Sequence, residues 1–342
     1  MVPPKIVSLF SGAGGLDLGF SEAGYELALA IDNSKWAIET HKVNFSATRS
    51  VAADLVALQP AGVLSKLGDL LTPGEAIGVI GGPPCQGFSR GNPKALAADP
   101  RNKLPLLYLE IVEALQAIYD VKFVLFENVL GIRDVKHAEA FSGILDKFKQ
   151  IGLTSSVSEF CALDFGVPQN RKRIIISGFT DASASAKFVP KRVSGVDLTV
   201  RGAIGHLPEP AFYSRHLVPD EVPHHVNHWT MRPLSKRFSE PENVATGARS
   251  FRRLAWDKPS PTVAYGHREI HVHPSGHRRL SIHEAMLLQG FPSSFTLKGP
   301  LSSQVEQVSN AVPPPLARAL ADAALSAMAT NDSMHSGVPV GK

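Results

Sequence analysis

Short apolar runs alternate with stretches of helical spacing along the first half of the chain. The runs predicted to be strands are Lys5–Leu9, Tyr25–Ile31, Ile77–Ile80, Phe123–Phe126 and Ile174–Gly178. A short helix is predicted after the first strand and should end near Ala23. Further helices are predicted at Trp36–Asn44, Leu104–Ile118, Ala138–Ile151 and Pro314–Ala329. Strands that are apolar throughout must be covered on both faces. The alternation therefore predicts an α/β fold with a mostly parallel sheet and helices on both faces.

The pattern changes near Asp181. From Lys187 to Lys298 it is irregular and rich in proline, with little periodicity. This stretch has 16 Lys and Arg against 9 Asp and Glu, a net charge of +7, and it holds 10 of the 13 histidines. The whole chain carries +4, so the remainder carries −3. The excess of positive charge is therefore regional, with a basic, histidine-rich insert beside a slightly acidic remainder.

Length and composition narrow the class of protein. The 342 residues fit two domains, or one large domain with an insertion. Two cysteines, Cys85 and Cys161, are too few for a disulfide framework or a cysteine-rich zinc site. Without an 18-residue apolar run, and with Lys5 interrupting any secretory segment, no membrane span or leader is expected. We expect a cytoplasmic protein in which Cys161, next to Phe160, belongs to the core.

A glycine-rich turn follows the first predicted strand, in Phe10–Asp17 (FSGAGGLD). Such a turn lets the backbone approach a ligand, but the dinucleotide fingerprint requires a third glycine where this chain has Asp17. A carboxylate there suits a cationic ligand, and Asp32, after the second strand, can accept hydrogen bonds from ribose hydroxyls. The combination predicts a nucleoside with a cationic tail, which describes S-adenosylmethionine. The alternative is a purely structural turn with a helix cap.

A rigid loop that contains a cysteine, Gly81–Ser89 (GGPPCQGFS), follows the third strand. Two prolines and two glycines place Cys85 just past the carboxyl end of a strand, where open α/β sheets bind ligands. This placement predicts a reactive thiol, although free cysteines are more often buried packing residues. The basic, poorly periodic stretch that continues to Lys103 is typical of a binding loop or lid, or of a solvated surface loop.

An acid and an arginine are expected at the same edge of the sheet. Glu127 directly follows the fourth apolar strand, and Arg173 directly precedes the fifth. The glutamate could donate a proton, and the arginine could offer forked donors to a carbonyl oxygen. Each alone would more simply join two loops through an ion pair. Together with Cys85 they predict a catalytic site.

The ordered set of motifs resembles DNA (cytosine-5)-methyltransferases of the bacterial restriction–modification type, from about residue 5 to 320. The matching segments are Phe10–Gly15 (FSGAGG), Gly82–Ser89 (GPPCQGFS), Glu127–Val129 (ENV), Gln169–Arg173 (QNRKR), Arg279–Ser281 with Glu284, Leu288–Pro292 (LQGFP) and Asn310–Pro314 (NAVPP). Residues about 182–250 match no motif. One departure is Ser309, where the family usually has glycine.

The resemblance implies a Rossmann-like α/β fold and a division into domains. Residues 1–181 would form a catalytic domain that binds S-adenosylmethionine, completed by the C-terminal segment 301–329. Residues 182–300 would form a small irregular target-recognition domain, and residues 330–342 a flexible tail.

The resemblance also assigns roles to individual residues. Cys85 would be the nucleophile, Glu127 would contact N3 and the amine of the target cytosine, and Arg173 would hold its O2. Arg171 would support Glu127 or the DNA backbone. The expected cofactor residues are Phe10, Ser11, Gly12, Gly14, Gly15, Leu16, Asp32, Asn33, Asp54, Pro84, Leu104 and Asn310.

The chemistry of cytosine explains why such an enzyme needs these groups. Carbon C5 is too weak a nucleophile, so a thiolate adds to C6 first and gives C5 carbanion character. Charge that develops on the ring is stabilised at N3 and O2, which are the tasks of Glu127 and Arg173. A stacked base is out of reach, so the cytosine must be flipped out of the duplex.

The basic insert would bind double-stranded DNA. The expected DNA-binding residues are Ser89, Arg90, Arg232, Arg252, Arg253 and Arg268, with arginines neutralising phosphates or reading guanine. The histidines near His224 and His271 are expected to be structural or DNA-contacting and not to bind a metal. The expected protein is a monomer, with any cognate restriction endonuclease acting separately.

Two other functions remain open from the sequence. The same chemistry could act on tRNA, although the relatives that do so usually lack Gly-Phe-Ser after Pro-Cys-Gln and the long basic insert. The chain could also be a DNA-binding regulator on a decayed enzyme scaffold, although the reactive groups Cys85, Glu127, Arg171 and Arg173 are all present.

Overall fold

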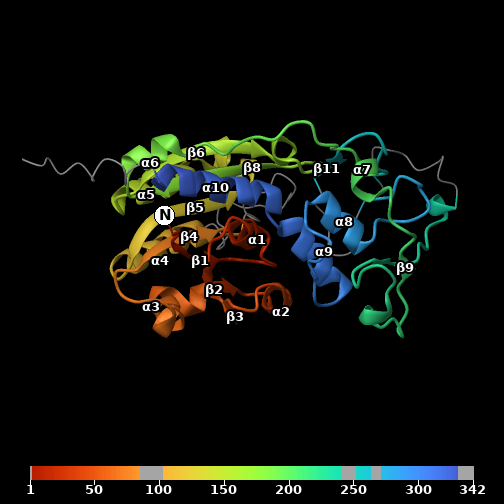
Figure 1. Ribbon diagram of the computed structural model, residues 1–342, viewed down its shortest axis with the longest axis horizontal. Coiled ribbons are helices and arrows are strands. Elements are labelled where there is room, and N and C mark those ends of the chain that lie inside the picture. The colour runs from red at the N-terminus through yellow and green to blue at the C-terminus, as the bar shows by residue number, and fades with distance from the viewer. Residues whose placement is uncertain (1, 85–102, 240–251, 263–270, 330–342) are drawn as a thin grey trace, which may run out of the picture.

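The computed structural model describes residues 2–84, 103–239, 252–262 and 271–329 (Figure 1). Its centre is a seven-stranded sheet in the order β3-β2-β1-β4-β5-β8-β6. The strands are β1 (Lys5–Leu9), β2 (Leu27–Asp32), β3 (Arg49–Ala52), β4 (Ala76–Gly81), β5 (Asp120–Asn128), β6 (Thr154–Cys161) and β8 (Lys172–Phe179). The strands β3, β2, β1, β4 and β5 are parallel to one another, and β8 runs antiparallel between β5 and β6.

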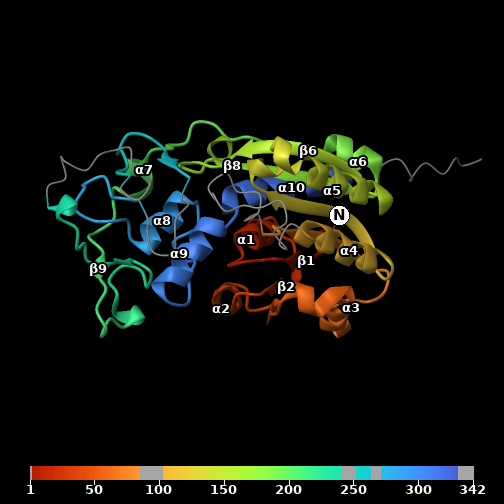
Figure 2. The ribbon, with the colours of Figure 1, turned by 180° about the vertical axis from the view of Figure 1, so that it is seen from behind.

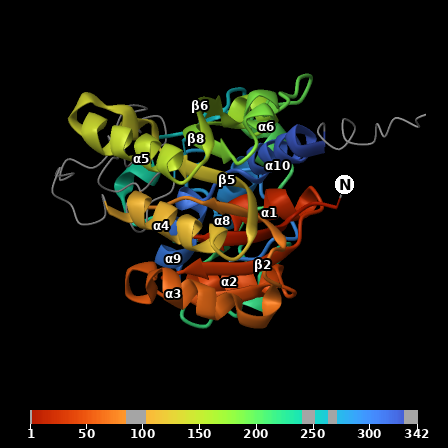
Figure 3. The same ribbon diagram turned by 90° about the vertical axis from the view of Figure 1, so that its left-hand side faces the viewer.

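Helices cover both faces of the sheet, which Figure 3 shows nearly edge-on. One face packs against α1 (Gly15–Glu22), α6 (Ala182–Lys187) and α10 (Pro314–Ala329). The other packs against α3 (Leu55–Leu67), α4 (Leu104–Gln116) and α5 (Ala138–Gln150). Helix α2 (Lys35–Asn44) lies beside β2 and β3. Because adjacent strand residues point to opposite faces, Ile6 and Val7 of β1 enter different core clusters, and both are fully buried.

The two ends of the fold meet where α1 packs against α10. The Tyr25 hydroxyl, just after α1, donates a hydrogen bond of 3.1 Å to the Ala321 carbonyl. Gly19 allows this close approach, because a Cβ there would overlap the backbone of Arg318. The C-terminal helix is therefore an integral part of the layer over the sheet.

The region between α6 and α10 is mostly irregular and lies at the left of Figure 2. Its helices are α7 (Val200–Ile204), α8 (Ile282–Leu288) and α9 (Leu301–Asn310). Two-residue strands pair β9 (Ala211–Phe212) with β10 (Trp229–Thr230), and β11 (Ser260–Pro261) with β7 (Gln169–Asn170). Over all the described residues, single turns of 3-10 helix cover Gly68–Leu70, Leu130–Arg133, Val135–His137, Ala162–Phe165, Pro219–Glu221 and Lys236–Phe238.

Local sequence explains where several helices begin. The side chains of Ser34 and Asp54 accept hydrogen bonds from backbone amides in the first turns of α2 and α3. At the start of α8, Ser281 and Glu284 form a capping box in which each side chain accepts from the backbone amide of the other. These caps fix the direction in which each helix leaves the preceding loop.

The predicted fold class is confirmed, and the strands and helices expected from the pattern are present within a few residues. The pattern missed α3, β3 and β6, and it also missed the helices α6, α7, α8 and α9 in and beside the stretch that was expected to be irregular. Helix α3 is interrupted by Gln59, which has a non-helical backbone before Pro60, and β3 and β6 contain many polar residues. The prediction that Cys161 lies in the core is wrong. It is only half-buried, because β6 is the edge strand of the sheet.

Candidate active site

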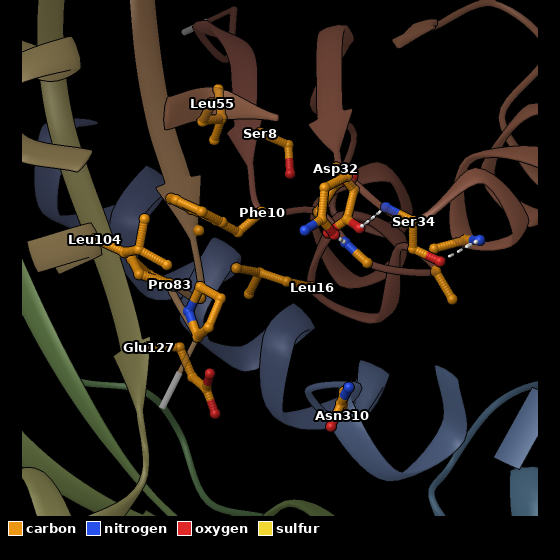
Figure 4. A pocket seen from close by; sticks show the side chains of 18 of the residues that line it. Ser8, Phe10, Leu16, Asp32, Ser34, Leu55, Pro83, Leu104, Glu127 and Asn310 are labelled. Carbon is orange, nitrogen blue, oxygen red and sulfur yellow. Dashed lines mark hydrogen bonds between the residues drawn. The ribbon is translucent and has the colours of Figure 1, made fainter. Parts of the chain in front are cut away.

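A cavity of about 1020 Å³ opens at the carboxyl ends of β1, β2, β4 and β5 (Figure 4). The strand order reverses between β1 and β4, and in open α/β sheets ligands bind at such a switch point. Phe10 and Leu104 line one part of it, Asp32 another, and Asn310 approaches from α9. The cavity continues to Glu127 and Arg173, so the predicted cofactor residues and the predicted base-binding pair share one space.

The glycine-rich turn forms the floor of this cavity, and its glycines are needed for different reasons. Gly12 and Gly14 have φ of 56° and 90°, in the left-handed region that side chains rarely adopt. A Cβ at Gly14 would also lie 2.5 Å from the Phe45 ring, and one at Gly15 would overlap the Val312 carbonyl oxygen. Phe10 adopts a φ of 54°, which is uncommon for a residue with a side chain. The turn therefore has a backbone conformation, fixed by these contacts, that lines the cavity closely.

Asp32 links the second strand to this turn. Its Oδ2 accepts a hydrogen bond of 2.9 Å from the Gly12 amide, and its Oδ1 accepts one of 2.8 Å from the Ser34 amide. Burial raises the pKa of the Asp32 carboxyl above its ordinary value, and the nearby charges of Glu306 and Asp17 act in the same direction. The side chain is rigidly placed at the point where the sequence predicted a ribose-binding acid.

The remaining expected cofactor residues surround the same cavity. Ser11, Gly12, Gly15, Leu16, Asn33, Asp54, Pro84 and Leu104 all line it. Gly14 lies against His41 and Phe45 and supports the turn from behind. Asp54 caps α3, since its Oδ1 accepts a hydrogen bond of 2.9 Å from the Val56 amide. Sequence reasoning missed Ser8, Leu55 and Glu306, which also line the cavity and carry no recognisable local pattern.

Asp17 is placed differently from expectation. Its side chain has no accessible surface, and its Oδ1 lies 3.3 Å from Nε2 of the equally buried His41. The His41 ring in turn contacts the Ser50 hydroxyl at 2.8 Å. The carboxylate therefore joins α1 to α2 beneath the turn, which corrects the expectation that it faces a cationic ligand.

Glu127 and Arg173 meet at the far end of the cavity. The two side chains are each 11% exposed, and Glu127 Oε1 lies 2.8 Å from Arg173 Nε. Their strands pair antiparallel, with Glu127 opposite Ile175, which brings the start of β8 to the end of β5. A Cβ at Gly82 would lie 2.8 Å from Glu127 Oε2. Glycine at this position therefore gives the carboxylate its room.

Asn128 anchors the segment that leads to Cys85. Its Nδ2 donates a hydrogen bond of 3.2 Å to the Pro83 carbonyl, and its Oδ1 accepts one of 2.9 Å from the Val129 amide. The side chain is almost completely buried. The sequence identified Glu-Asn-Val only as a motif, and the structure assigns its asparagine this anchoring contact.

Several predicted site residues are placed away from the cavity or outside the described residues. Arg171 is completely buried, where it has no access to solvent. Arg232 is exposed and lies over the Phe212 ring at 5.0 Å, whereas Arg253 donates a hydrogen bond of 2.7 Å to the Pro274 carbonyl. Arg252 is exposed. Cys85, Ser89, Arg90 and Arg268 lie outside the described residues.

The histidines of the insert form a packed group. His225 and His283 stack with ring centroids 3.9 Å apart, and His228 bonds to Ser281 and to the Pro208 carbonyl. Burial lowers the pKa of His283 to about 3 and those of His271 and His273 to about 4. In the part of the chain that the structure describes, no group of three His, Cys, Asp or Glu is arranged to hold a metal. The same part contains no helix long and apolar enough to cross a membrane.

Comparison with known proteins agrees with this geometry. The model of the family described as C-5 cytosine-specific DNA methylase matches residues 4–326. The type II methyltransferase M1.HphI of Haemophilus parahaemolyticus is 32% identical over 95% of this chain and 87% of its own length. The type II methyltransferase M.MthTI of Methanothermobacter thermautotrophicus is also 32% identical, over 92% of this chain and 95% of its own.

Two solved structures share the fold. One is described as a DNA modification methyltransferase of an Escherichia coli prophage, with a TM-score of 0.76, 25% identity, and coverage of 96% of this chain and 100% of that one. The other is a DNMT2 variant of Spodoptera frugiperda, with a TM-score of 0.63, 20% identity, and coverage of 94% and 100%. The family match spans nearly the whole chain and includes both ends of the cavity, so the protein belongs to the C-5 cytosine-specific DNA methylases and is a DNA (cytosine-5)-methyltransferase.

Proposed function

We propose that this enzyme transfers a methyl group from S-adenosylmethionine to C5 of a flipped-out cytosine in a specific sequence of duplex DNA, as part of a restriction–modification system. One observation carries the proposal. A single cavity joins the glycine-rich turn and Asp32 to the Glu127–Arg173 pair, beside the segment that leads to Cys85. A donor and an acceptor held at its two ends would be adjacent, which methyl transfer requires.

The charges of the cavity fit S-adenosylmethionine better than a dinucleotide. Apart from Asp17, which is buried against His41, the acids among the described lining residues are Asp32, Asp54, Glu110, Glu127 and Glu306, and the bases are Lys103 and Arg173. An acidic lining favours a sulfonium and disfavours a pyrophosphate. Phe10, Leu55 and Leu104 supply apolar surface for an adenine, and Asp32 supplies acceptors for ribose hydroxyls. When bound, the cofactor supplies an electrophilic methyl group and leaves as S-adenosylhomocysteine.

The protein side chains would activate the cytosine. The Cys85 thiolate adds to C6 and forms a covalent bond that is broken again after the C5 proton is removed. Glu127 holds a proton at N3, and Arg173 donates to O2. N3 and O2 lie side by side on one edge of the cytosine. Because Glu127 and Arg173 are only 2.8 Å apart, the two side chains can bind both atoms at once. Asn128 would keep the Cys85 segment at the correct distance by holding the Pro83 carbonyl.

The basic region would supply the DNA surface. We assign residues 182–300 to target recognition, residues 1–181 with 301–329 to catalysis, and 330–342 to a tail. Contacts to phosphates and bases would come from Ser89, Arg90, Arg232, Arg252, Arg253 and Arg268. The enzyme would act as a monomer in the cytoplasm, and a cognate endonuclease would act separately.

The chain offers a matched test, since it contains only two cysteines. Wild type, Cys85→Ala and Cys161→Ala are expressed in a host without DNA methylation, and genomic cytosines are mapped by chemical conversion and sequencing. Wild type and Cys161→Ala should methylate one short sequence, and Cys85→Ala should methylate none while still binding DNA. Methylation by Cys85→Ala would overturn the mechanism.

A second experiment tests for the covalent intermediate and distinguishes DNA methylation from the two other functions. A duplex that carries 5-fluorocytosine in the mapped sequence should form a stable adduct with wild type and S-adenosylmethionine, because fluorine at C5 cannot leave as a proton does. Methylated tRNA with unmodified DNA would instead show the RNA-directed activity. DNA binding with neither adduct nor methylation would show a regulator.

A further inference from the structure

A buried side-chain relay connects the segment before β8 to the C-terminal segment that lines the active-site cavity. Gln169 Nε2 donates a hydrogen bond of 2.7 Å to Gln289 Oε1, and Gln289 Nε2 donates one of 2.7 Å to the Ala311 carbonyl. Gln169 Nε2 also lies 3.3 Å from the Leu288 carbonyl. Gln169 and Gln289 have no exposed surface, and 120 residues separate them in the sequence.

One end of this relay borders the base-binding groups. Gln169 begins the short strand β7, two residues before Arg171 and four before Arg173. The pairing of β7 with β11 ties this segment to the irregular region at Ser260. A shift of Gln169 would therefore move the start of β8, where Arg173 contacts Glu127.

The other end borders the glycine-rich turn. Ala311 directly follows Asn310, and both line the cavity. A Cβ at Gly15 would come within 3.0 Å of Ala311 Cβ, so this part of the C-terminal segment lies directly on the turn. Gln289 directly follows α8 as its C-cap, and Gly290 after it has a φ of 83° and packs closely against Pro315.

We propose that Gln289 is a positioning residue for methyl transfer, whose single amide group fixes the base-binding segment through Gln169 and the cofactor-binding segment through Ala311. The inference rests on the proposed function of the cavity. The amide uses its acceptor on one side and its donor on the other, so the two bonds are separable by mutation. Buried hydrogen bonds of this length hold their partners within a narrow range, and misplacement of about 1 Å is costly for transfer.

A matched control exists in Gln304 of α9. It is also a buried glutamine with two bonds, because its Nε2 donates to the Gly299 carbonyl at 2.7 Å and its Oε1 accepts from Asn227 at 3.1 Å. Neither Gly299 nor Asn227 lines the cavity. Gln289→Met and Gln304→Met each therefore remove a buried side-chain amide with two hydrogen bonds. The two variants differ in whether the partners of that amide belong to the segments around the cavity.

The experiment compares four proteins, wild type, Gln289→Met, Gln169→Met and Gln304→Met, well below their melting temperatures. Calorimetry gives the Kd for S-adenosylhomocysteine, and single-turnover transfer to unmethylated genomic DNA gives the rate. Gln289→Met should weaken cofactor binding and slow transfer, each by roughly tenfold or more. Gln169→Met should slow transfer and leave the cofactor Kd within twofold of wild type. Gln304→Met should change neither.

The outcomes separate the inference from the proposed function. A wild type that methylates no cytosine defeats the proposed function, and the cofactor Kd values of Gln289→Met and Gln304→Met still test the relay. Equal Kd and rate in these two variants overturn the positioning role. If Gln289→Met does not fold, Gln289→Asn, whose amide is one methylene too short to reach both partners, must show the same pattern, and its failure to do so also overturns the inference.

Discussion

The Glu127 carboxylate and the Arg173 guanidinium contact each other at 2.8 Å across two antiparallel strands, at the end of the cavity that lies opposite the glycine-rich turn. The pair is nearly buried, so each charge is compensated mainly by the other. Under the proposed function, a cytosine that enters this site would replace part of that contact with its own N3 and O2. The ion pair would then hold both proposed base-binding groups in position before the base arrives.

Replacement of Glu127 by glutamine should show whether the side chain acts through its size or through the proton that it carries. Gln has the same size but cannot carry a proton to N3, so kcat should fall by roughly 100-fold. Transfer of a labelled methyl group into genomic DNA measures this. Glu113→Gln removes the acid of an exposed ion pair with Lys147 and serves as the control. A loss of less than threefold in Glu127→Gln would rule out the assigned role.

Gly82→Ala should reduce activity without unfolding the protein. The new methyl group would lie 2.8 Å from Glu127 Oε2 and would push the carboxylate from its place, although the backbone at Gly82 accepts alanine. We expect at least a tenfold loss of kcat with an almost unchanged Tm. Gly143→Ala in α5 is the control, since its Cβ would meet nothing within 4 Å and should stabilise the helix by about 0.5–1 kcal/mol. Equal activity in both variants would contradict the explanation for this glycine.

The histidine group should make stability depend on pH in mild acid. Burial holds the pKa of His283 at about 3, below the ordinary 6.5, so the unfolded chain takes up this proton first as the pH falls. The stabilisation is complete above pH 6.5 and is lost progressively between 6.5 and about 3, at about 1.4 kcal/mol per pH unit for each such group.

Urea unfolding at pH 7, 6 and 5 tests this dependence. His283→Phe keeps a ring beside His225 and removes one titrating group, so its stability should fall less steeply with acid than that of wild type. His216→Phe, at an exposed position, should keep the wild-type slope. A wild-type free energy of unfolding that stays constant from pH 7 to pH 5 would disprove the prediction.

Arg232 should contribute to DNA binding through charge. Its guanidinium lies over the Phe212 ring of β9, whose side chain is partly exposed, and this contact orients the guanidinium before DNA arrives. Arg232→Ala should weaken duplex binding and lower the slope of log K against log salt by about 1 if it contacts one phosphate. Arg49→Ala, which breaks an exposed pair with Asp69 at the start of the edge strand β3, should leave the slope unchanged. Unchanged DNA affinity in Arg232→Ala would exclude this contact.

The sequence predicted most of the regular structure, because its signals are local. Strand β1 was predicted with the bounds that the structure has, since five apolar-rich residues precede a glycine turn. Helix α3 was missed because Gln59 and Pro60 break its period, and β6 because an edge strand needs few apolar residues. Cys161 was misplaced for the same reason.

The site was predictable where it depends on strand ends and was not where it depends on long-range pairing. Glu127 and Arg173 were expected at one edge because each adjoins an apolar strand. No local pattern could indicate that Asp17 turns toward His41, since that contact depends on how α1 packs against α2. The bond between Gln169 and Gln289 likewise joins segments 120 residues apart. Contacts of this kind follow from topology, and sequence periodicity does not encode them.

The packing of α10 on α1 has a consequence for the order in which the enzyme can be made. The Tyr25 hydroxyl reaches a carbonyl 296 residues further along, and Asn310 closes the cavity from the same C-terminal segment. During synthesis, the N-terminal strands must wait until α9 and α10 have left the ribosome before this wall exists. A nascent chain interrupted before α9 would leave α1 uncovered at Gly19 and hold no complete ligand site, so methylating activity arises only after α9 and α10 have been made.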